Sequence, residues 1–149
     1  MRTRLPFWTF HVVLPIVIGG LIYVCWRDPN LLMFQWFRGL GLEPLLLRLR
    51  LVAAPAQTSM PNWVILSLPD GLWVYAFTAF MIEIWRGADS TFIKTFWISL
   101  AVLLGAGSEL GQLAGVVPGV FDLTDFLLCV CAGAMALSLA PRKLHLQGA

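Results

Sequence analysis

The chain has 149 residues, of which 59% are hydrophobic and 12% are charged, and its mean hydropathy is +0.82. Soluble domains have about 45–50% apolar and about 25% charged residues, so this composition excludes a soluble monomer and predicts an all-α, polytopic membrane protein with a single domain, residues 1–149. Ten Lys and Arg against eight Asp and Glu leave a net charge of +2 and no basic stripe, which argues against nucleic acid as a partner.

The first predicted span covers residues 5–26, because about 20 apolar residues in a helix cross about 30 Å of hydrocarbon. The run is long for the apolar region of a secretory signal and lacks a small-residue cleavage pattern near Gly19, so we expect it to be retained. Pro15 is expected to kink the helix. His11 is expected to face a neighbouring helix, and a functional role for it is the alternative.

The first loop, residues 28–66, contains two short helical patterns. One ends near Gly39, and the other begins at Glu43 and ends near Pro55. Both are too short to cross a membrane and are rich in Leu, Phe and Trp, which is typical of helices that lie in the plane of the membrane. This segment carries three arginines, namely Arg38, Arg48 and Arg50.

Three further spans are predicted, at residues 69–85, 91–113 and 123–140. The second span begins with Pro69 followed by Asp70, a pair that signals the start of a helix. The fold class is therefore a bundle of four transmembrane helices, with short interfacial helices in the first loop.

The distribution of basic residues predicts the orientation. With the N-terminus inside, six basic residues lie on the cytoplasmic side and four lie outside in the first loop, which fits the positive-inside rule. The loop at residues 114–121 has no Lys or Arg, in agreement with an outside position. We therefore expect a protein of the cell (inner) membrane with cytoplasmic termini. The six inner residues are Arg2, Arg4, Arg86, Lys94, Arg142 and Lys143.

This topology brings polar residues from three spans to the outer side of the membrane. Glu109 is the most informative of them, because it lies near the end of a helix, where the helix dipole opposes a negative charge, and because a carboxylate in the bilayer is costly. We expect it to be paired, protonated or turned to a polar cavity. The residues gathered there are Asp70, Glu109, Gln112, Asp122, Thr124 and Asp125, with the three loop arginines above them.

Each carboxylate also has a structural interpretation that stays open. Asp70, Asp122 and Asp125 stand at the starts of helices, where negative charge is stabilised by about 0.3–1 kcal/mol. The spacing of Asp122 and Asp125 resembles a capping arrangement, in which the first accepts backbone N–H groups and the second sits at the third helical position. Glu109 could be an interfacial charge or pair with a loop arginine and lock the bundle.

Two segments, Ser108-Glu109-Leu110-Gly111-Gln112 and Val117-Pro118-Gly119-Val120-Phe121-Asp122-Leu123-Thr124-Asp125, precede a span rich in Gly and Ala. They resemble the signature half of VanZ-like membrane proteins, in which a Glu and a Gln three apart end one span and an Asp starts the next. The family usually has an Arg in the short loop and an Asn in the last span, and this chain has neither. The match carries over to Glu109, Gln112 and Asp125, and more loosely to Asp122.

The resemblance implies a small, usually four-span protein of the cell envelope, in a family that includes proteins reducing susceptibility to lipoglycopeptide antibiotics. One hypothesis is an enzyme or lipid-handling protein with an outward-facing carboxylate pocket. Two neighbouring carboxylates in a poorly solvated site can divide the roles of acid and base. Catalytic roles would fall to Glu109, Asp125 and Asp70. Substrate contacts would fall to Gln112, Asp122 and Thr124, with Arg38, Arg48 and Arg50 gripping the phosphate of a lipid or lipid-linked substrate.

Other functions stay open beside this one. The carboxylate and amide oxygens could instead hold a divalent cation such as Mg²⁺ or Ca²⁺, whereas the three cysteines lie in apolar runs without ligand spacing and predict neither a disulfide nor a zinc site. The second hypothesis is an accessory or assembly subunit that binds a larger membrane protein complex through its Trp-rich and Leu-rich interfacial helices. An ion pathway ranks last, because only His11 is expected in the middle of the membrane.

Overall fold

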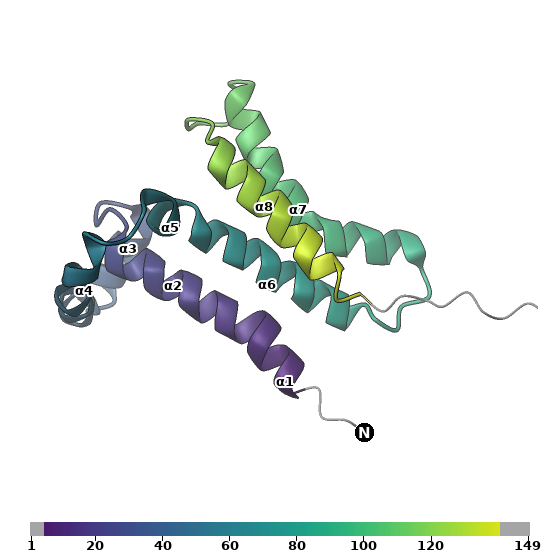
Figure 1. Cartoon of the computed structure of the whole chain (residues 1–149), viewed down its shortest axis with the longest axis horizontal. Helices are drawn as coiled ribbons and strands as arrows, with labels where there is room; N and C mark the ends of the chain where they lie inside the picture. The colour runs from purple at the N-terminus through teal and green to yellow at the C-terminus, as the bar shows by residue number, and fades with distance from the viewer. Residues whose placement is uncertain (1–4, 141–149) are drawn as a thin grey trace, which may run out of the picture.

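The computed structural model describes residues 5–140, and within that range all regular secondary structure is helical (Figure 1). The all-α prediction is therefore confirmed for this part of the chain. The predictions for Arg2, Arg4, Arg142 and Lys143 fall outside the described residues.

The first predicted span is one continuous helix, Leu5–Trp26. It consists of α1 (Leu5–Trp8), a π-helical turn η1 (Thr9–Val13) and α2 (Leu14–Trp26). The wider turn ends just before Pro15, which is buried in the first turn of α2. Proline lacks the N–H of the helical ladder and its ring crowds the carbonyl four residues earlier, so the π-helical turn gives this proline room within the helix.

The first loop folds into three short helices, α3 (Leu32–Gly39), α4 (Glu43–Gln57) and α5 (Asn62–Leu66). α3 and α4 are separated by Gly41, whose φ of +72° is favourable for glycine. α4 continues past Pro55, where the sequence predicted its end. This proline falls in the last turns of α4, so the N–H that it lacks weakens only the end of the helix.

The remaining predicted spans correspond to α6 (Leu68–Ile84), α7 (Thr91–Leu113) and α8 (Leu123–Leu137). Two helices of the described chain, Leu5–Trp26 and α7, are long and apolar enough to cross a membrane, and α8 is a shorter apolar helix. The Ser90 hydroxyl caps α7 by accepting a hydrogen bond from the Ile93 N–H at 3.3 Å.

α6 lies at the centre of the bundle and packs against α2, α7 and α8 (Figure 1). Glycines allow the close approaches, because a side chain at these positions would collide with the neighbouring helix. A Cβ on Gly105 would lie 3.0 Å from both Cys129 Sγ and Val74 Cγ2, and one on Gly133 would overlap Val102. The core formed around these contacts contains Val74, Ala101, Ala106 and Cys129, with Val102, Phe126 and Ala132 packed against it.

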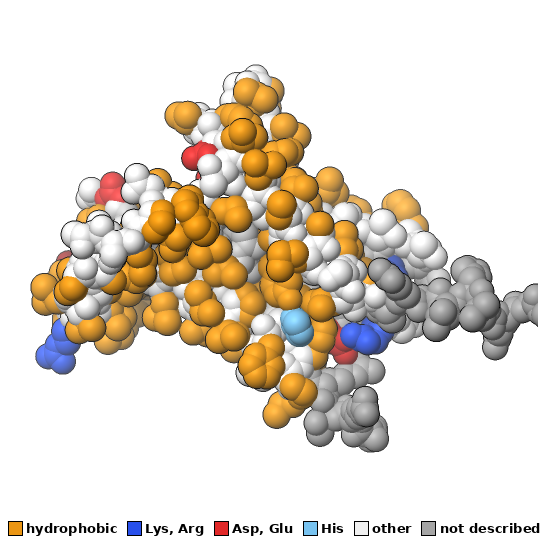
Figure 2. All heavy atoms as spheres, viewed as in Figure 1, with side chains coloured by type: hydrophobic (Ala, Val, Ile, Leu, Met, Phe, Trp, Pro, Cys, Tyr) orange, Lys and Arg blue, Asp and Glu red, His pale blue; other side chains and the backbone are white. Residues whose placement is uncertain are grey.

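The surface of the bundle is largely apolar. Figure 2 shows hydrophobic side chains over most of the visible face, with charged groups concentrated toward the ends of the bundle. Leu21, Leu103, Leu104 and Met135 are each at least half exposed. Monomeric soluble proteins rarely expose apolar patches larger than a few hundred Å², so this surface fits a bilayer better than water.

Candidate functional site

Three carboxylates from three helices lie at the same end of the bundle. Asp70 begins α6, Glu109 lies near the end of α7 and Asp125 lies in the first turn of α8. They are close enough for the charges of Glu109 and Asp125 to act on Asp70, and for all three charges to act on the thiol of Cys129 on α8. We call Asp70, Glu109 and Asp125 the carboxylate cluster.

Glu109 holds the start of the neighbouring helix. Its side chain is buried, with the residue 8% exposed, and Oε2 accepts a hydrogen bond from the backbone N–H of Asp122 at 3.0 Å. Asp122 in turn caps α8, because its Oδ1 accepts the N–H of Thr124 at 2.7 Å. The capping role considered for Asp122 is thus present, and Glu109 joins α7 to α8 through that cap.

Asp125 occupies the position that completes a capping box, three residues after the N-cap. In such a box its carboxylate would accept the N–H of the N-cap residue. Here Glu109 accepts that N–H instead, and Asp125 Oδ1 is buried without a hydrogen-bond partner among residues 5–140. A buried acceptor in this state carries a desolvation cost of about 1–3 kcal/mol, which a hydrogen-bond donor on a ligand would relieve.

Arg27 is the basic residue at the cluster, and the sequence analysis missed this role. Its terminal nitrogen lies 3.5 Å from Asp70 Oδ2, its guanidinium lies 5.3 Å from the ring centre of Tyr23, and its buried Nε has no partner among the described residues. The sequence held a signal for this contact, because Arg27 directly follows the first predicted span and Asp70 begins the second, on the same side of the predicted topology.

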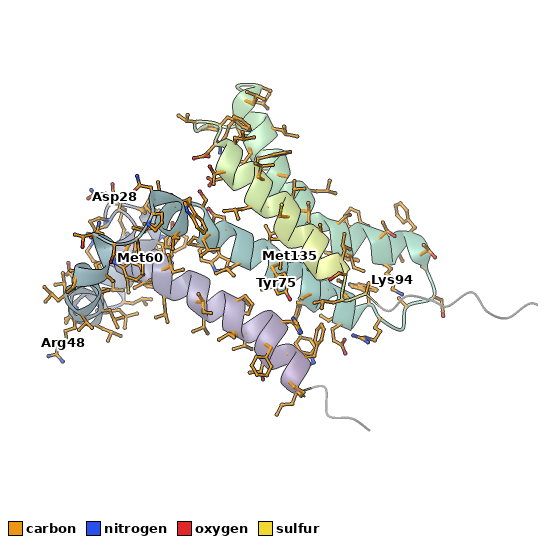
Figure 3. All side chains as sticks on the ribbon, viewed as in Figure 1. Asp28, Arg48, Met60, Tyr75, Lys94 and Met135 are labelled. Atoms are coloured by element: carbon orange, nitrogen blue, oxygen red, sulfur yellow. The ribbon has the colours of Figure 1, made fainter. Side chains whose placement is uncertain are left out.

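The three arginines predicted to lie above the cluster are elsewhere. Arg50 covers the end of α2, donating hydrogen bonds to the carbonyl oxygens of Val24 at 3.0 Å and Arg27 at 2.7 Å. Arg38 lines a small cavity of about 170 Å³ beside Glu43. Arg48 is exposed on α4 and points away from the bundle (Figure 3). The structure therefore does not bring these arginines to the carboxylates.

The remaining predicted residues border the cluster. Gln112 packs against Gly119 in the loop before α8, where a Cβ would lie 2.7 Å from the amide carbon of Gln112. Thr124 is exposed and contributes its backbone N–H to the cap. No group of three or more His, Cys, Asp or Glu in residues 5–140 is arranged to hold a metal ion, and the divalent cation considered from the sequence stays a prediction.

The charges at the opposite end of the bundle form an ion-paired rim. Buried Glu83 contacts Arg86 at 2.5 Å, and Lys94 Nζ donates to the carbonyl oxygen of Arg86 at 3.4 Å. Glu83 and Arg86 pair with each other in this rim, whereas Asp125 at the carboxylate cluster has a buried carboxylate oxygen without a partner in the described chain, so we take the cluster as the candidate functional site.

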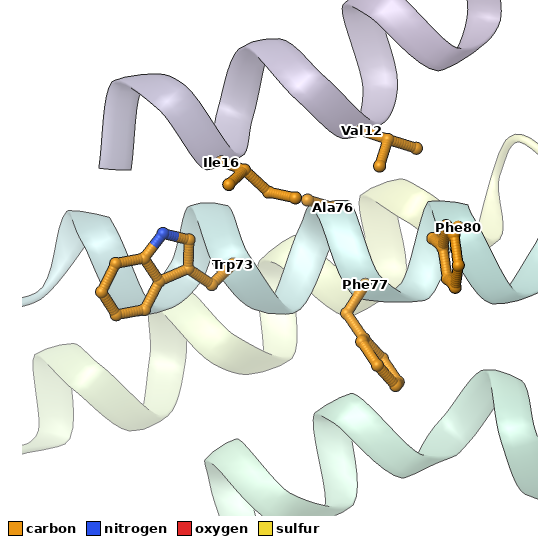
Figure 4. A pocket seen from close by; sticks show the side chains of 6 residues that line it. All are labelled: Val12, Ile16, Trp73, Ala76, Phe77 and Phe80. Atoms are coloured by element: carbon orange, nitrogen blue, oxygen red, sulfur yellow. The ribbon is translucent and has the colours of Figure 1, made fainter. Parts of the chain in front are cut away.

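Two apolar grooves lie along α6, between the carboxylate cluster and the opposite end of the bundle. The larger, of about 520 Å³, lies between the first span and α6 and is lined by Val12, Ile16, Trp73, Ala76, Phe77 and Phe80 (Figure 4). The smaller, of about 270 Å³, lies where α2, α6 and α8 meet. Both have apolar walls, so a ligand in either would be hydrophobic.

Comparisons with known proteins identify no relative: no protein-family model, no curated protein and no solved structure matches the chain.

Proposed function

We propose that the chain is a VanZ-like protein of the cell envelope that crosses the inner membrane four times, with both termini in the cytoplasm. α6 and α8 are assigned as crossings because they pack along α2 and α7 within one apolar body. α3 and α4 expose Trp36, Leu47 and Leu51 beside arginines, a pattern typical of helices at a bilayer surface. The motif of Glu109, Gln112 and Asp125 supports the family assignment.

The proposed activity is to bind the polar headgroup of a lipid or lipid-linked substrate at the carboxylate cluster and to accept a proton from it. The observation that carries this proposal is Asp125 Oδ1, a buried acceptor without a partner in the described chain, beside two further acids. Arg27 is the basic group that pairs with the cluster, so formal charges of −3 and +1 leave a net −2. A hydroxyl or amine of the headgroup would supply the missing donor and match that charge.

The three acids of the cluster have different partners, so we assign them different roles. Glu109 is occupied by the Asp122 N–H, so its role is to position the start of α8 and leave Asp125 open. Asp125 is the group that would contact the substrate and accept a proton from its hydroxyl or amine. Asp70 is held by Arg27 and would orient the headgroup from α6.

Exchanging one carboxylate tests the proposal. Asp125→Asn keeps the size and polarity of the side chain but removes its charge and basicity, so we expect the lipid profile and lipoglycopeptide susceptibility of the expressing cells to revert to those of cells without the protein. Asp89→Asn, an exposed residue near the opposite rim, is the matched control and should behave as the wild type. Wild-type behaviour of Asp125→Asn at equal protein level would overturn the proposal.

The accessory-subunit hypothesis is a distinct outcome of purification. In mild detergent we expect a monomer or small homo-oligomer that retains lipid. Stoichiometric recovery with one larger membrane protein would instead identify a subunit that binds through its interfacial helices.

The four-span topology has its own test. Alkaline phosphatase, which is active only outside the inner membrane, is expected to be active when inserted at residues 58–61 or 115–119 and inactive at residues 86–90. Activity at residues 86–90 would contradict the orientation.

A further inference from the structure

One end of the smaller groove is lined by residues that are close in sequence to two members of the carboxylate cluster, on α6 and on α8. Gly71, which lines the groove, directly follows Asp70, and Leu128, on the opposite wall, stands one helical turn after Asp125. From there the groove runs to Met135 near the other end of α8. The larger groove is lined by residues of the first span and α6, from Trp73 to Phe80 on α6, whereas the smaller one is lined by both α6 and α8, the helices that carry Asp70 and Asp125.

The walls of this groove suit a hydrocarbon chain. They are formed by apolar side chains of α2, α6 and α8 and include the Tyr75 hydroxyl, whose oxygen lies 2.6 Å from His11 Nδ1 and is therefore already hydrogen-bonded. Met135, at one end of the groove, is 64% exposed, and methionine adapts its shape to a neighbouring apolar group. The groove thus offers contact area without a polar group that needs a partner from the ligand.

We propose that this groove binds one hydrocarbon chain of the lipid whose headgroup occupies the carboxylate cluster. The inference rests on the proposed function and extends it to the substrate class, an amphiphile whose chain lies against α6 and α8 while its hydroxyl or amine reaches Asp125. Two observations carry the inference, namely that the helices lining the groove also carry Asp70 and Asp125, and that the side chains lining it are apolar apart from the hydrogen-bonded Tyr75 hydroxyl. The bilayer supplies chains at this depth, so the ligand enters sideways.

Photo-crosslinking tests the inference with the intact protein. The protein is placed in vesicles of phosphatidylethanolamine and phosphatidylglycerol that contain phosphatidylethanolamine with a diazirine on one acyl chain. We expect the label on peptides of α6 and α8 that carry Leu72, Cys131 and Met135, in excess over peptides of α7 that carry the exposed Leu103 and Leu104.

Variants that fill the groove sharpen the test. Cys131→Trp and Met135→Trp each place a bulky ring at an exposed position of the groove wall. We expect either to reduce labelling of α6 about tenfold, equivalent to about 1.4 kcal/mol of binding free energy. Val130→Trp puts the same ring on a neighbouring exposed position outside the groove and should leave the labelling unchanged.

The outcomes separate this inference from the proposed function. Equal labelling of α6, α7 and α8, or no loss in both groove variants, would overturn the groove even if Asp125→Asn abolishes the cellular effect. Labelling of the groove together with a silent Asp125→Asn would retain the groove and overturn the headgroup site.

Discussion

Two substitutions at Glu109 separate the contribution of its hydrogen bond to stability from the contribution of its negative charge. Gln at this position keeps an oxygen that accepts the Asp122 N–H, but as a neutral acceptor. A hydrogen bond to a charged group contributes about 1.5–3 kcal/mol and a neutral one about 0.5–1.5 kcal/mol, so the bond loses about 1 kcal/mol. Removing one of three neighbouring negative charges offsets part of that loss. We therefore expect Glu109→Gln to change the free energy of unfolding by less than about 1 kcal/mol.

Glu109→Ala removes the acceptor altogether and leaves the Asp122 N–H without its partner. The expected cost is about 1–3 kcal/mol, and α8 should fray at its first turn because its cap is no longer held by α7. Unfolding in mild detergent by titration with sodium dodecyl sulfate measures both variants, and the seven tryptophans provide the fluorescence signal. Glu43→Ala, at an exposed first-turn position of α4, is the control for loss of a glutamate.

Equal destabilisation of the protein by Glu109→Gln and Glu109→Ala, or none by either, would contradict the role of Glu109 as the acceptor that holds the start of α8. Glu109→Gln also changes the formal net charge of the cluster from −2 to −1, which weakens its match to a headgroup amine, so we expect this variant to lose the cellular effect while the folded protein persists in the membrane. A fully active Glu109→Gln would show that the charge has no role at the cluster.

Three further predictions concern stability, each measured by the same titration. Arg50→Ala should cost about 2 kcal/mol, because two carbonyl oxygens at the end of α2 lose a charged donor; a cost below about 0.5 kcal/mol would contradict this. Gly133→Ala should cost about 1–3 kcal/mol through overlap with Val102, and Val102→Ala should recover most of it. Tyr75→Phe should cost about 1 kcal/mol, and the same change in a His11→Phe background should cost nothing more.

The helices could be predicted from the sequence because their boundaries depend on local signals. The predicted span at residues 91–113 coincides with α7, which starts at a Ser90 cap and ends where Gly115 takes a φ of +71°. α6 begins around the Pro69 and Asp70 pair that marked its start in the sequence. These signals need only a few neighbouring residues, so no knowledge of packing is required to interpret them.

The contacts of the site could be predicted only in part. That the cluster lies at one end of the bundle follows from the order of the spans, but the partner of Glu109 is a backbone N–H, which no residue type reveals. The sequence predicts the three loop arginines above the carboxylates, but it carries no signal for the group that each of these side chains contacts. Arg50 turns to carbonyl oxygens that the end of a helix leaves without partners, whereas Arg27 turns to Asp70. Whether an arginine contacts carbonyl oxygens or Asp70 depends on how α4 packs on α2.

The short length of α8 has a consequence for the surrounding lipid. Its 15 residues at about 1.5 Å each extend about 22 Å, less than the roughly 30 Å of a typical hydrocarbon core. In the proposed topology the leaflets must thin beside this helix to avoid exposing its polar ends. This local thinning would bring headgroups and water closer to Asp125. A lipid beside the protein could then contact this carboxylate while it stays in its own leaflet.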